Sequence, residues 1–389
     1  MSINFFIKTR RIVGDRRIEK EWSCFNDKEI AVNLFYAAND EVEIDVADFE
    51  LVKKINLPGG AAPLNLVMRL FGAVIFCIWS FFKVWIYSSS KVHWVNDPIL
   101  FPLVILLSYR SSDYIIWDHH ELPPDWIFKN GLVKYFFQVA YKRASCIVHT
   151  NLPRKELLEQ RLKYNHPNVM YLPNYPKKSE MAEYKAVELP QSFQERQFVL
   201  LQSTFGAHRA DIEIFSAIKK AGLIAVHAGS IDSQRLNAIE AEVGSLDFCE
   251  FIGHRSIEEI NWLLKNCLCT IIFYKNTSSN NWLCDPNRLY QSIAQNVWVI
   301  TGRNPTSLLA LKGYKKVLEV DLDLGNVDQV HEAIAKIIKF DSLKLNDGEV
   351  TTFASSYIPN YWENFSSVFD HVEEIERKMS MTSTNKEGG

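Results

Sequence analysis

Histidine and carboxylate side chains directly follow one apolar stretch of the chain. Residues 114–117 (YIIW) have the composition of a buried strand, and the next four residues are Asp118, His119, His120 and Glu121. Polar residues just past the carboxyl end of a parallel strand lie where ligands bind in open α/β sheets. A histidine beside carboxylates can exchange a proton with a ligand hydroxyl, so this stretch is a candidate site. A loop cap or a satisfied buried network is the structural alternative.

A second stretch with chemical potential is residues 280–305, in which a polar loop, a short helix and an apolar strand are expected in turn. Asn281 and Asn287 favour turns, and Pro286 suits the first turn of a helix. The N-terminus of a helix presents unpaired N–H groups and the positive end of the helix dipole. A phosphate-bearing ligand is its natural partner, and Arg288 adds a positive charge.

Two other loops carry residues suited to a cleft. Gly14, Asp15 and Arg16 lie between a predicted strand and a helix that begins near Arg16, and a glycine there permits close backbone approach. Arg209 follows the predicted strand 198–202 at the expected start of a helix, and arginine can bind a diphosphate through two N–H groups at once. For both loops, a solvated surface position is the structural alternative.

The elements around these residues predict an α/β protein with two domains. With 389 residues, of which 47% are hydrophobic, the chain is larger than one core usually holds. Alternating strands and helices indicate parallel, doubly wound sheets. Strands are predicted at 3–7, 31–36, 42–46, 92–95, 114–117 and 146–150, and then at 198–202, 224–229, 270–274 and 317–320. The expected parts are a domain 1–175, a polar linker 176–197, a domain 198–356 and a disordered tail 380–389.

Composition restricts the cellular setting. The net charge of −3 and the sequence pI near 6.4 give no indication of a nucleic-acid partner. The seven cysteines are odd in number and form no CxxC pair, which indicates a reduced, cytosolic compartment. The first 17 residues contain only a five-residue apolar run followed by charges, so no secretory signal is predicted. The protein is therefore expected in the cytoplasm.

Residues 64–87 are the most apolar segment of the chain. Arg69 and Lys83 enclose only 13 uncharged residues, whereas about 20 are needed to span a bilayer core. A transmembrane span is therefore not predicted. A helix packed on the sheet is one interpretation. The other is a partly exposed helix whose aromatic side chains reach the membrane interface, which would give peripheral attachment to the inner face of the plasma membrane.

Several short motifs resemble those of GT-B glycosyltransferases, in particular family 4 (group 1) enzymes of polysaccharide biosynthesis. The string DHHELPP resembles the family's yDaHE motif, and DPNRLYQSIAQNVWVITGRNP resembles its PNK-hydrophobic-hydrophobic-E helix and following strand. Three further strings resemble segments that line the family's cleft: GDRRIEKEWSCF, STFGAHRADIEIFSAIKKA and FCEFIGHRSIEEINWLLKNC. Residues 357–379, with Trp362, resemble the closing helix that crosses back onto the first domain.

The resemblance implies a GT-B fold, which has two Rossmann-like domains facing a cleft. It also implies transfer of a sugar from a nucleotide-diphosphate donor to a saccharide or lipid-linked acceptor, without a cofactor or a catalytic metal. It assigns catalysis to Asp118, His120 and Glu121, and acceptor-side loop positions to Asp15, Arg16 and His119. Donor binding falls to Gly14, Arg209, Gly253, Asn281, Asn287, Arg288 and Gln291.

The sequence departs from the family pattern at two positions of the donor segment. Gln291 stands where a glutamate usually holds the donor ribose, and Asn296 stands where glycine is usual. Glutamine still exchanges hydrogen bonds with hydroxyls but lacks the charge that strengthens them. A sugar-nucleotide epimerase of the same fold and an inactive partner or scaffold subunit are therefore kept as alternatives. The sugar, the nucleotide, the acceptor and the anomeric outcome stay open.

Two other classes are disfavoured by specific motifs. No GxGxxG follows the first predicted strand, which argues against a dinucleotide-dependent oxidoreductase. Asp321 and Asp323 form a DxD pair, but they follow a late predicted strand with little chain behind them. A solvated loop is therefore the interpretation of this pair, and no metal site is predicted.

Overall fold

The chain folds into two compact units, which are described separately. The structure is a computed structural model that describes residues 2–10, 12, 15–27, 29–39, 48–63, 65–176, 180–194, 197–203, 206–230, 232–321, 327–342 and 374. Within these residues, the first unit comprises the chain up to Pro173 together with residue 374, and the second unit begins at Asn174. The predicted strand 42–46, nearly all of the predicted closing helix 357–379 and the tail 380–389 lie outside the described residues.

The described residues of the first unit form a seven-stranded parallel sheet with the order β3-β2-β1-β4-β5-β6-β7. Its strands are β1 Ser2–Lys8, β2 Ala31–Ala37, β3 Leu51–Lys54, β4 Val92–Asn96, β5 Tyr114–His119, β6 Cys146–His149 and β7 Val169–Tyr171. Its helices are α1 Arg16–Asp27, α2 Leu66–Tyr87, the 3-10 turn η2 Pro98–Leu100, α3 Phe101–Leu107, α4 Asp125–Lys129, α5 Gly131–Arg143 and α6 Leu152–Leu162.

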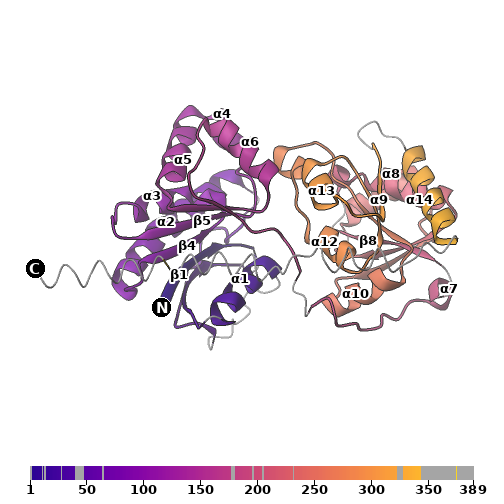
Figure 1. The fold of residues 1–389 in the computed structure, drawn as a ribbon, viewed down its shortest axis with the longest axis horizontal. Helices are drawn as coiled ribbons and strands as arrows, with labels where there is room; N and C mark the ends of the chain where they lie inside the picture. Colours follow the sequence, from indigo (N-terminus) through magenta and orange to yellow (C-terminus); the bar gives the residue numbers. More distant parts are fainter. Residues whose placement is uncertain are drawn as a thin grey trace, which may run out of the picture. The chain divides into compact units, whose positions relative to one another are not determined.

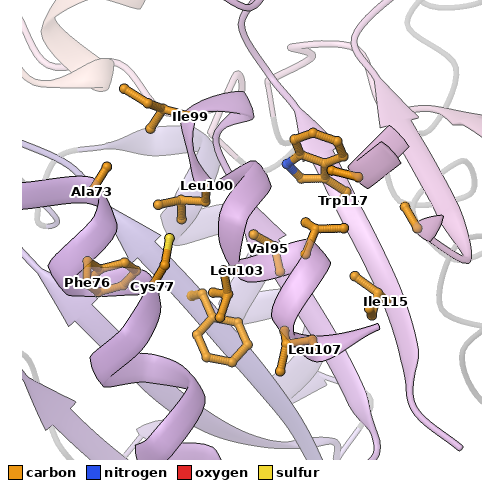
Figure 2. Packing of buried hydrophobic residues seen from close by; sticks show 14 of the residues in the cluster. Ala73, Phe76, Cys77, Val95, Ile99, Leu100, Leu103, Leu107, Ile115 and Trp117 are labelled. Atoms are coloured by element: carbon orange, nitrogen blue, oxygen red, sulfur yellow. The ribbon is translucent and has the colours of Figure 1, made fainter. Parts of the chain in front are cut away.

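Alternating side chains on the strands direct helices to both faces of this sheet (Figure 1). On one face, Phe5 and Trp94 pack against Phe25 of α1. On the opposite face, Phe6 belongs to the large core that α2, α3 and α5 cover. Figure 2 shows Phe76 of α2 within this second core.

In the second unit, the part of the chain that the structure describes forms a six-stranded parallel sheet with the order β10-β9-β8-β11-β12-β13. Its strands are β8 Phe198–Gln202, β9 Ile224–Ala228, β10 Cys249–Gly253, β11 Cys269–Ile272, β12 Trp298–Thr301 and β13 Val317–Glu319. Its helices are α7 Gln191–Gln194, η3 Ala207–Arg209, α8 Asp211–Lys220, α9 Ser233–Val243, α10 Ile257–Asn266, α11 Ser279–Trp282, α12 Asn287–Ala294, α13 Pro305–Ala310 and α14 Val327–Ser342. Helices α8, α9 and α14 lie on one face and α10 on the other (Figure 1).

The predicted α/β class and the parallel sheets are confirmed, and several details are corrected. Strand β3 was not predicted because half of its residues are lysines and its side chains are only partly buried. Strand β5 extends through Asp118 and His119 and does not end at Trp117. Arg209 lies in the 3-10 turn η3, and α8 begins only at Asp211.

In both sheets, the strand order reverses at one point. In the first sheet, the chain moves outward from β1 to β3 and then returns to β4, which lies on the other side of β1. In the second sheet, the same reversal lies between the neighbouring strands β8 and β11. Crevices at the carboxyl ends of strands next to such a reversal are the usual ligand sites of open α/β sheets. The candidate site residues lie at these two edges.

Candidate functional site

Asp118 is the best-fixed carboxylate at the carboxyl edge of the first sheet. It is completely buried near the end of β5, next to β4. Arg17 of α1 donates from Nη2 to Asp118 Oδ1 at 2.8 Å and from Nε to Oδ2 at 3.1 Å. Arg17 also donates from Nη1 to the Leu172 carbonyl at 2.9 Å, so it joins three parts of this unit.

His120 follows Asp118 on the same side of the chain. Its Nδ1 lies 3.6 Å from Asp118 Oδ2, and about a quarter of its side chain is exposed. Burial favours the neutral ring, but the charges of Asp118 and Asp97 outweigh it and raise the pKa of His120 to about 9. Burial also opposes ionisation of Asp118, yet Arg17 and His120 hold the pKa of that carboxyl well below its ordinary value. At neutral pH the pair is therefore an imidazolium and a carboxylate.

His119 points to the opposite face and is not a loop residue. Successive side chains of a strand alternate between faces, so the inclusion of His119 in β5 separates it from Asp118. Its ring packs 4.2 Å from that of Trp117 and 6.0 Å from that of Phe137, measured between centroids. Burial, together with His149, lowers the pKa of His119 well below its ordinary value. The expected acceptor-side position of His119 is therefore replaced by a core position.

The remaining predicted residues of the first unit are only partly defined. Glu121 is exposed. Asp15 accepts from the Ile18 N–H at 3.4 Å and so begins α1. Gly14 and the side chain of Arg16 lie outside the described residues.

Two charged residues at this edge were not predicted from the sequence. Lys8 ends β1, is buried and donates to the Ala61 carbonyl, and burial lowers its pKa. Asp97 follows β4 with φ +86°, which is unusual for a residue other than glycine. Its N–H donates to the Asp118 carbonyl at 3.2 Å, so the ends of β4 and β5 are held together. Such backbone strain often accompanies a functional position.

In the second unit, Arg209 and Arg288 share one aromatic ring. Their guanidinium carbons lie 5.3 and 5.2 Å from the ring centroid of Tyr274, which follows β11. Among the described residues, neither arginine forms an ion pair with a carboxylate. Burial and the charge of Arg288 lower the pKa of Arg209. Two like charges this close are an arrangement that a bound anion would stabilise.

Arg288 is fixed by the end of β8. It donates from Nη1 to the Gln202 carbonyl, while its buried Nε and Nη2 have no hydrogen-bond partner among the described residues. Both arginines, with Ser203, Gly206 and His227, line one small pocket of this unit. Buried donors without partners are rare in native proteins, so an anion or an ordered water is expected beside Arg288.

The segment around α12, which the resemblance assigns to donor binding, begins its helix close to the predicted position. Asn287 is the first residue of α12, Pro286 precedes it, and Gln291 is buried with its Oε1 3.5 Å from Gln202 Nε2. Asn296 has φ +56°, a left-handed conformation that asparagine tolerates better than most residues. The replacement of glycine by asparagine is therefore compatible with the backbone.

Gly253 and Asn281 are placed less directly. Gly253 ends β10 with φ +70°, and its carbonyl accepts from the Gly229 N–H at 2.9 Å. Asn281 lies in the short helix α11 and not in the predicted loop, and its Nδ2 donates to Thr277 Oγ1 at 2.7 Å. Gly229 was not among the predicted site residues. A Cβ added there would lie 2.1 Å from the Ser203 carbonyl oxygen. Only glycine fits this approach of two loops.

Comparison with solved structures places this architecture. No family model matches the chain, and no curated protein matches it by sequence. A crystal structure of Anabaena Alr3699/HepE in complex with UDP-glucose matches with a TM-score of 0.64 and 13% identity, covering 99% of this chain and 100% of that one. The chain has the GT-B fold.

Two further structural neighbours bear on the range of GT-B functions. WaaG, a glycosyltransferase involved in lipopolysaccharide biosynthesis, matches with a TM-score of 0.68 and 10% identity over 95% of this chain and 98% of that one. A putative UDP-N-acetylglucosamine 2-epimerase from Listeria monocytogenes matches with a TM-score of 0.63 and 10% identity over 96% and 98%. The GT-B fold thus carries both transferases and an epimerase.

Proposed function

We propose that this protein is a glycosyltransferase that moves a sugar from a nucleotide-diphosphate donor to a saccharide acceptor. The observation that carries the proposal is the pair Arg209 and Arg288 over Tyr274, with buried N–H groups of Arg288 unpaired among the described residues. A diphosphate supplies the acceptor oxygens that these donors lack. The neighbour structure that contains UDP-glucose supports a uridine nucleotide as the first candidate donor.

The proposed chemistry follows from charge. As the sugar leaves, negative charge builds up on the departing phosphate oxygen, and preplaced guanidinium groups stabilise it. The proposal therefore needs no metal ion, since the arginines supply the positive charge. Protonated His120, oriented by Asp118, presents an N–H donor to the reacting hydroxyls. Glu121 is proposed as the third catalytic residue, and Asp15 is assigned to the acceptor side. The described residues contain no group of three or more His, Cys, Asp or Glu that could hold a metal.

The acceptor is proposed to be lipid-linked, and the support comes from α2. By length and composition, residues Val67–Tyr87 of α2 are long and apolar enough to cross a membrane. The prediction from the short uncharged run was therefore wrong about the length of this apolar segment. However, Ala73, Phe76, Cys77 and Val84 are buried against the first unit. This packing favours a helix that lies on its own sheet, with the protein attached peripherally at a membrane surface.

The outer side of this helical layer has the composition of a membrane contact. Exposed apolar side chains recur along α2 at Val67, Phe71, Val74, Ile78, Phe82, Trp85 and Ile86, and on α5 at Leu132, Tyr135 and Phe136. We call these residues the apolar face. Helices α2, α3 and α5 contain five basic residues, Arg69, Lys83, Lys134, Lys142 and Arg143, and no acidic residue. Apolar side chains among basic residues suit the inner, anionic surface of a plasma membrane and a lipid-linked saccharide of surface-polysaccharide biosynthesis.

An epimerase is the second candidate, because one structural neighbour carries that description. Product analysis separates the two activities. With a uridine-diphosphate sugar alone, an epimerase releases an altered sugar nucleotide, whereas a transferase needs an acceptor to release the nucleoside diphosphate.

The first experiment is a thermal-shift screen over nucleoside diphosphates and their sugars, since a ligand that binds only the folded state raises the melting temperature. Turnover of the best-binding donor is then followed with lipid-linked and soluble saccharides, with and without EDTA. Absence of any shift with all nucleotides would contradict the proposal.

A further inference from the structure

Glu21 is a buried carboxyl group beside the Asp118–His120 pair. It lies one helical turn after Arg17 on α1 and is completely inaccessible to solvent. Neither of its carboxyl oxygens receives a hydrogen bond from the described residues, although Arg17 Nε is 3.0 Å from Oε1. Its other close charged neighbours are Asp118 and His120.

An ionised Glu21 would be unfavourable in this position. A buried carboxylate is stabilised by hydrogen-bond donors or by its own counter-ion, and a second carboxylate nearby opposes its charge. Arg17 Nε carries a single hydrogen, which Asp118 Oδ2 already accepts at 3.1 Å. A protonated Glu21 avoids this competition, because its O–H becomes a donor to the Asp118 carboxylate.

We infer that Glu21 is a positioning residue that stays protonated and donates its O–H to Asp118. Asp118 then accepts from Arg17 and Glu21 on one side and faces His120 on the other. The role in turnover rests on the proposed function, whereas the protonation of Glu21 does not.

The charges around the cluster agree with this assignment. Burial and the Asp118 charge raise the pKa of Glu21 well above its ordinary value, against the opposing charges of Arg17 and His120. Asp97, from the end of β4, acts on His120 as a second carboxylate, and burial raises the pKa of Asp97 also. Among the described residues, these groups have the largest electrostatic effects on Glu21 and His120.

The first test uses melting temperature and needs no substrate. If folding raises the pKa of a carboxyl group, the unfolded state loses the proton at a lower pH than the folded state does. Between these two pKa values, the contribution of the group to stability therefore declines as pH rises. In Glu21→Gln, the carboxamide keeps an N–H donor and has no proton to lose. The melting temperature of Glu21→Gln relative to the parent should therefore increase between about pH 5 and about pH 8.

Asp27→Asn is the matched control, because Asp27 is an exposed carboxyl at the end of the same helix. Its difference from the parent should stay nearly constant over this range. A difference for Glu21→Gln that is equally flat would overturn the protonation of Glu21, whatever the protein transfers.

The second test addresses positioning. Glu21→Leu removes the donor to Asp118, and a hydrogen bond to a charged group is worth enough to lower turnover by about 10- to 100-fold. Glu21→Gln should recover most of the lost turnover and should shift the alkaline limb of the curve of turnover against pH. A folded Glu21→Leu with parental turnover, or a Glu21→Gln as inactive as Glu21→Leu, would overturn the positioning role. If the parent itself binds no nucleotide, the proposed function fails while the melting test stands.

Discussion

Arg17 donates two hydrogen bonds to Asp118 from a position 101 residues earlier in the chain. Both side chains are almost completely inaccessible to solvent. A bidentate, buried guanidinium–carboxylate pair fixes distance and orientation at once. A residue of α1 therefore sets the orientation of Asp118, the carboxylate that faces His120.

Removal of Arg17 should destabilise the first unit. Arg17→Ala leaves the buried Asp118 without its main counter-ion, and breaking such a pair commonly costs about 3 to 5 kcal/mol. Urea unfolding measures the change. Arg161→Ala is the matched control because its ion pair with Asp125 is partly exposed, and it should cost about 0 to 1 kcal/mol. Equal losses in the two variants would show that burial of the Arg17 pair has no energetic consequence.

The charge on His120 should be visible in the pH dependence of stability. Its pKa is raised from 6.5 to about 9 on folding, so its stabilising contribution is fully present below pH 6.5 and is lost as pH rises through 9. His120→Gln should therefore be less stable than the parent near pH 6, and the difference should shrink toward pH 10. Urea unfolding at several pH values checks this. A constant difference would mean that the histidine gains no proton affinity from Asp118.

The sheets could be predicted from the sequence because apolar runs such as 3–7, 92–95 and 198–202 are buried on both faces in a parallel sheet. Arg209 and Arg288 were proposed from the sequence because each follows a recognisable strand or turn, and their role in binding stays a prediction. Tyr274 was predicted only as the end of a strand, since nothing in local spacing shows that two arginines converge on one ring.

Long-range pairing limits the prediction of the first site. The spacing of Arg17 and Glu21 on a helix was visible, but their contact with Asp118 depends on how α1 packs on the sheet. His119 could have been assigned correctly by extending the strand by two residues, because alternation then places it opposite Asp118. Asp97 was hidden because its unusual backbone has no sequence signal beyond the proline that follows.

The apolar face should bind anionic vesicles without contributing to stability. Phe71, Ile78 and Trp85 are 55%, 47% and 71% exposed, so serine at these positions should change the free energy of unfolding by less than about 0.5 kcal/mol each. Vesicle sedimentation should lose most of its signal in the triple variant and in high salt. Phe76→Ala is the contrasting variant: Phe76 is buried on the same helix, so its loss should cost about 3 to 5 kcal/mol.

Two controls define this membrane experiment. Leu309→Ser removes a similarly exposed apolar side chain from the second unit and should leave vesicle binding unchanged. Extraction with alkaline carbonate should release the parent from membranes. Retention in the pellet would show that α2 spans the bilayer, which its length and composition permit.

The arginine pair should control donor binding and turnover together. Arg209→Ala and Arg288→Ala each remove one guanidinium from the Tyr274 ring, and loss of one such electrostatic contact commonly costs about 10² to 10³ in rate. Lysine at either position should restore only part of the activity, because it keeps the charge but loses the planar fork of donors. Turnover and nucleotide-diphosphate affinity are measured for all four variants.

Arg303→Ala, at an exposed position of the same unit, is the control and should behave like the parent. Without an anion the two cations repel each other, so each alanine variant should melt no lower than Arg303→Ala while losing the thermal shift with nucleotide. Alanine variants that bind and turn over like the parent would place the donor elsewhere.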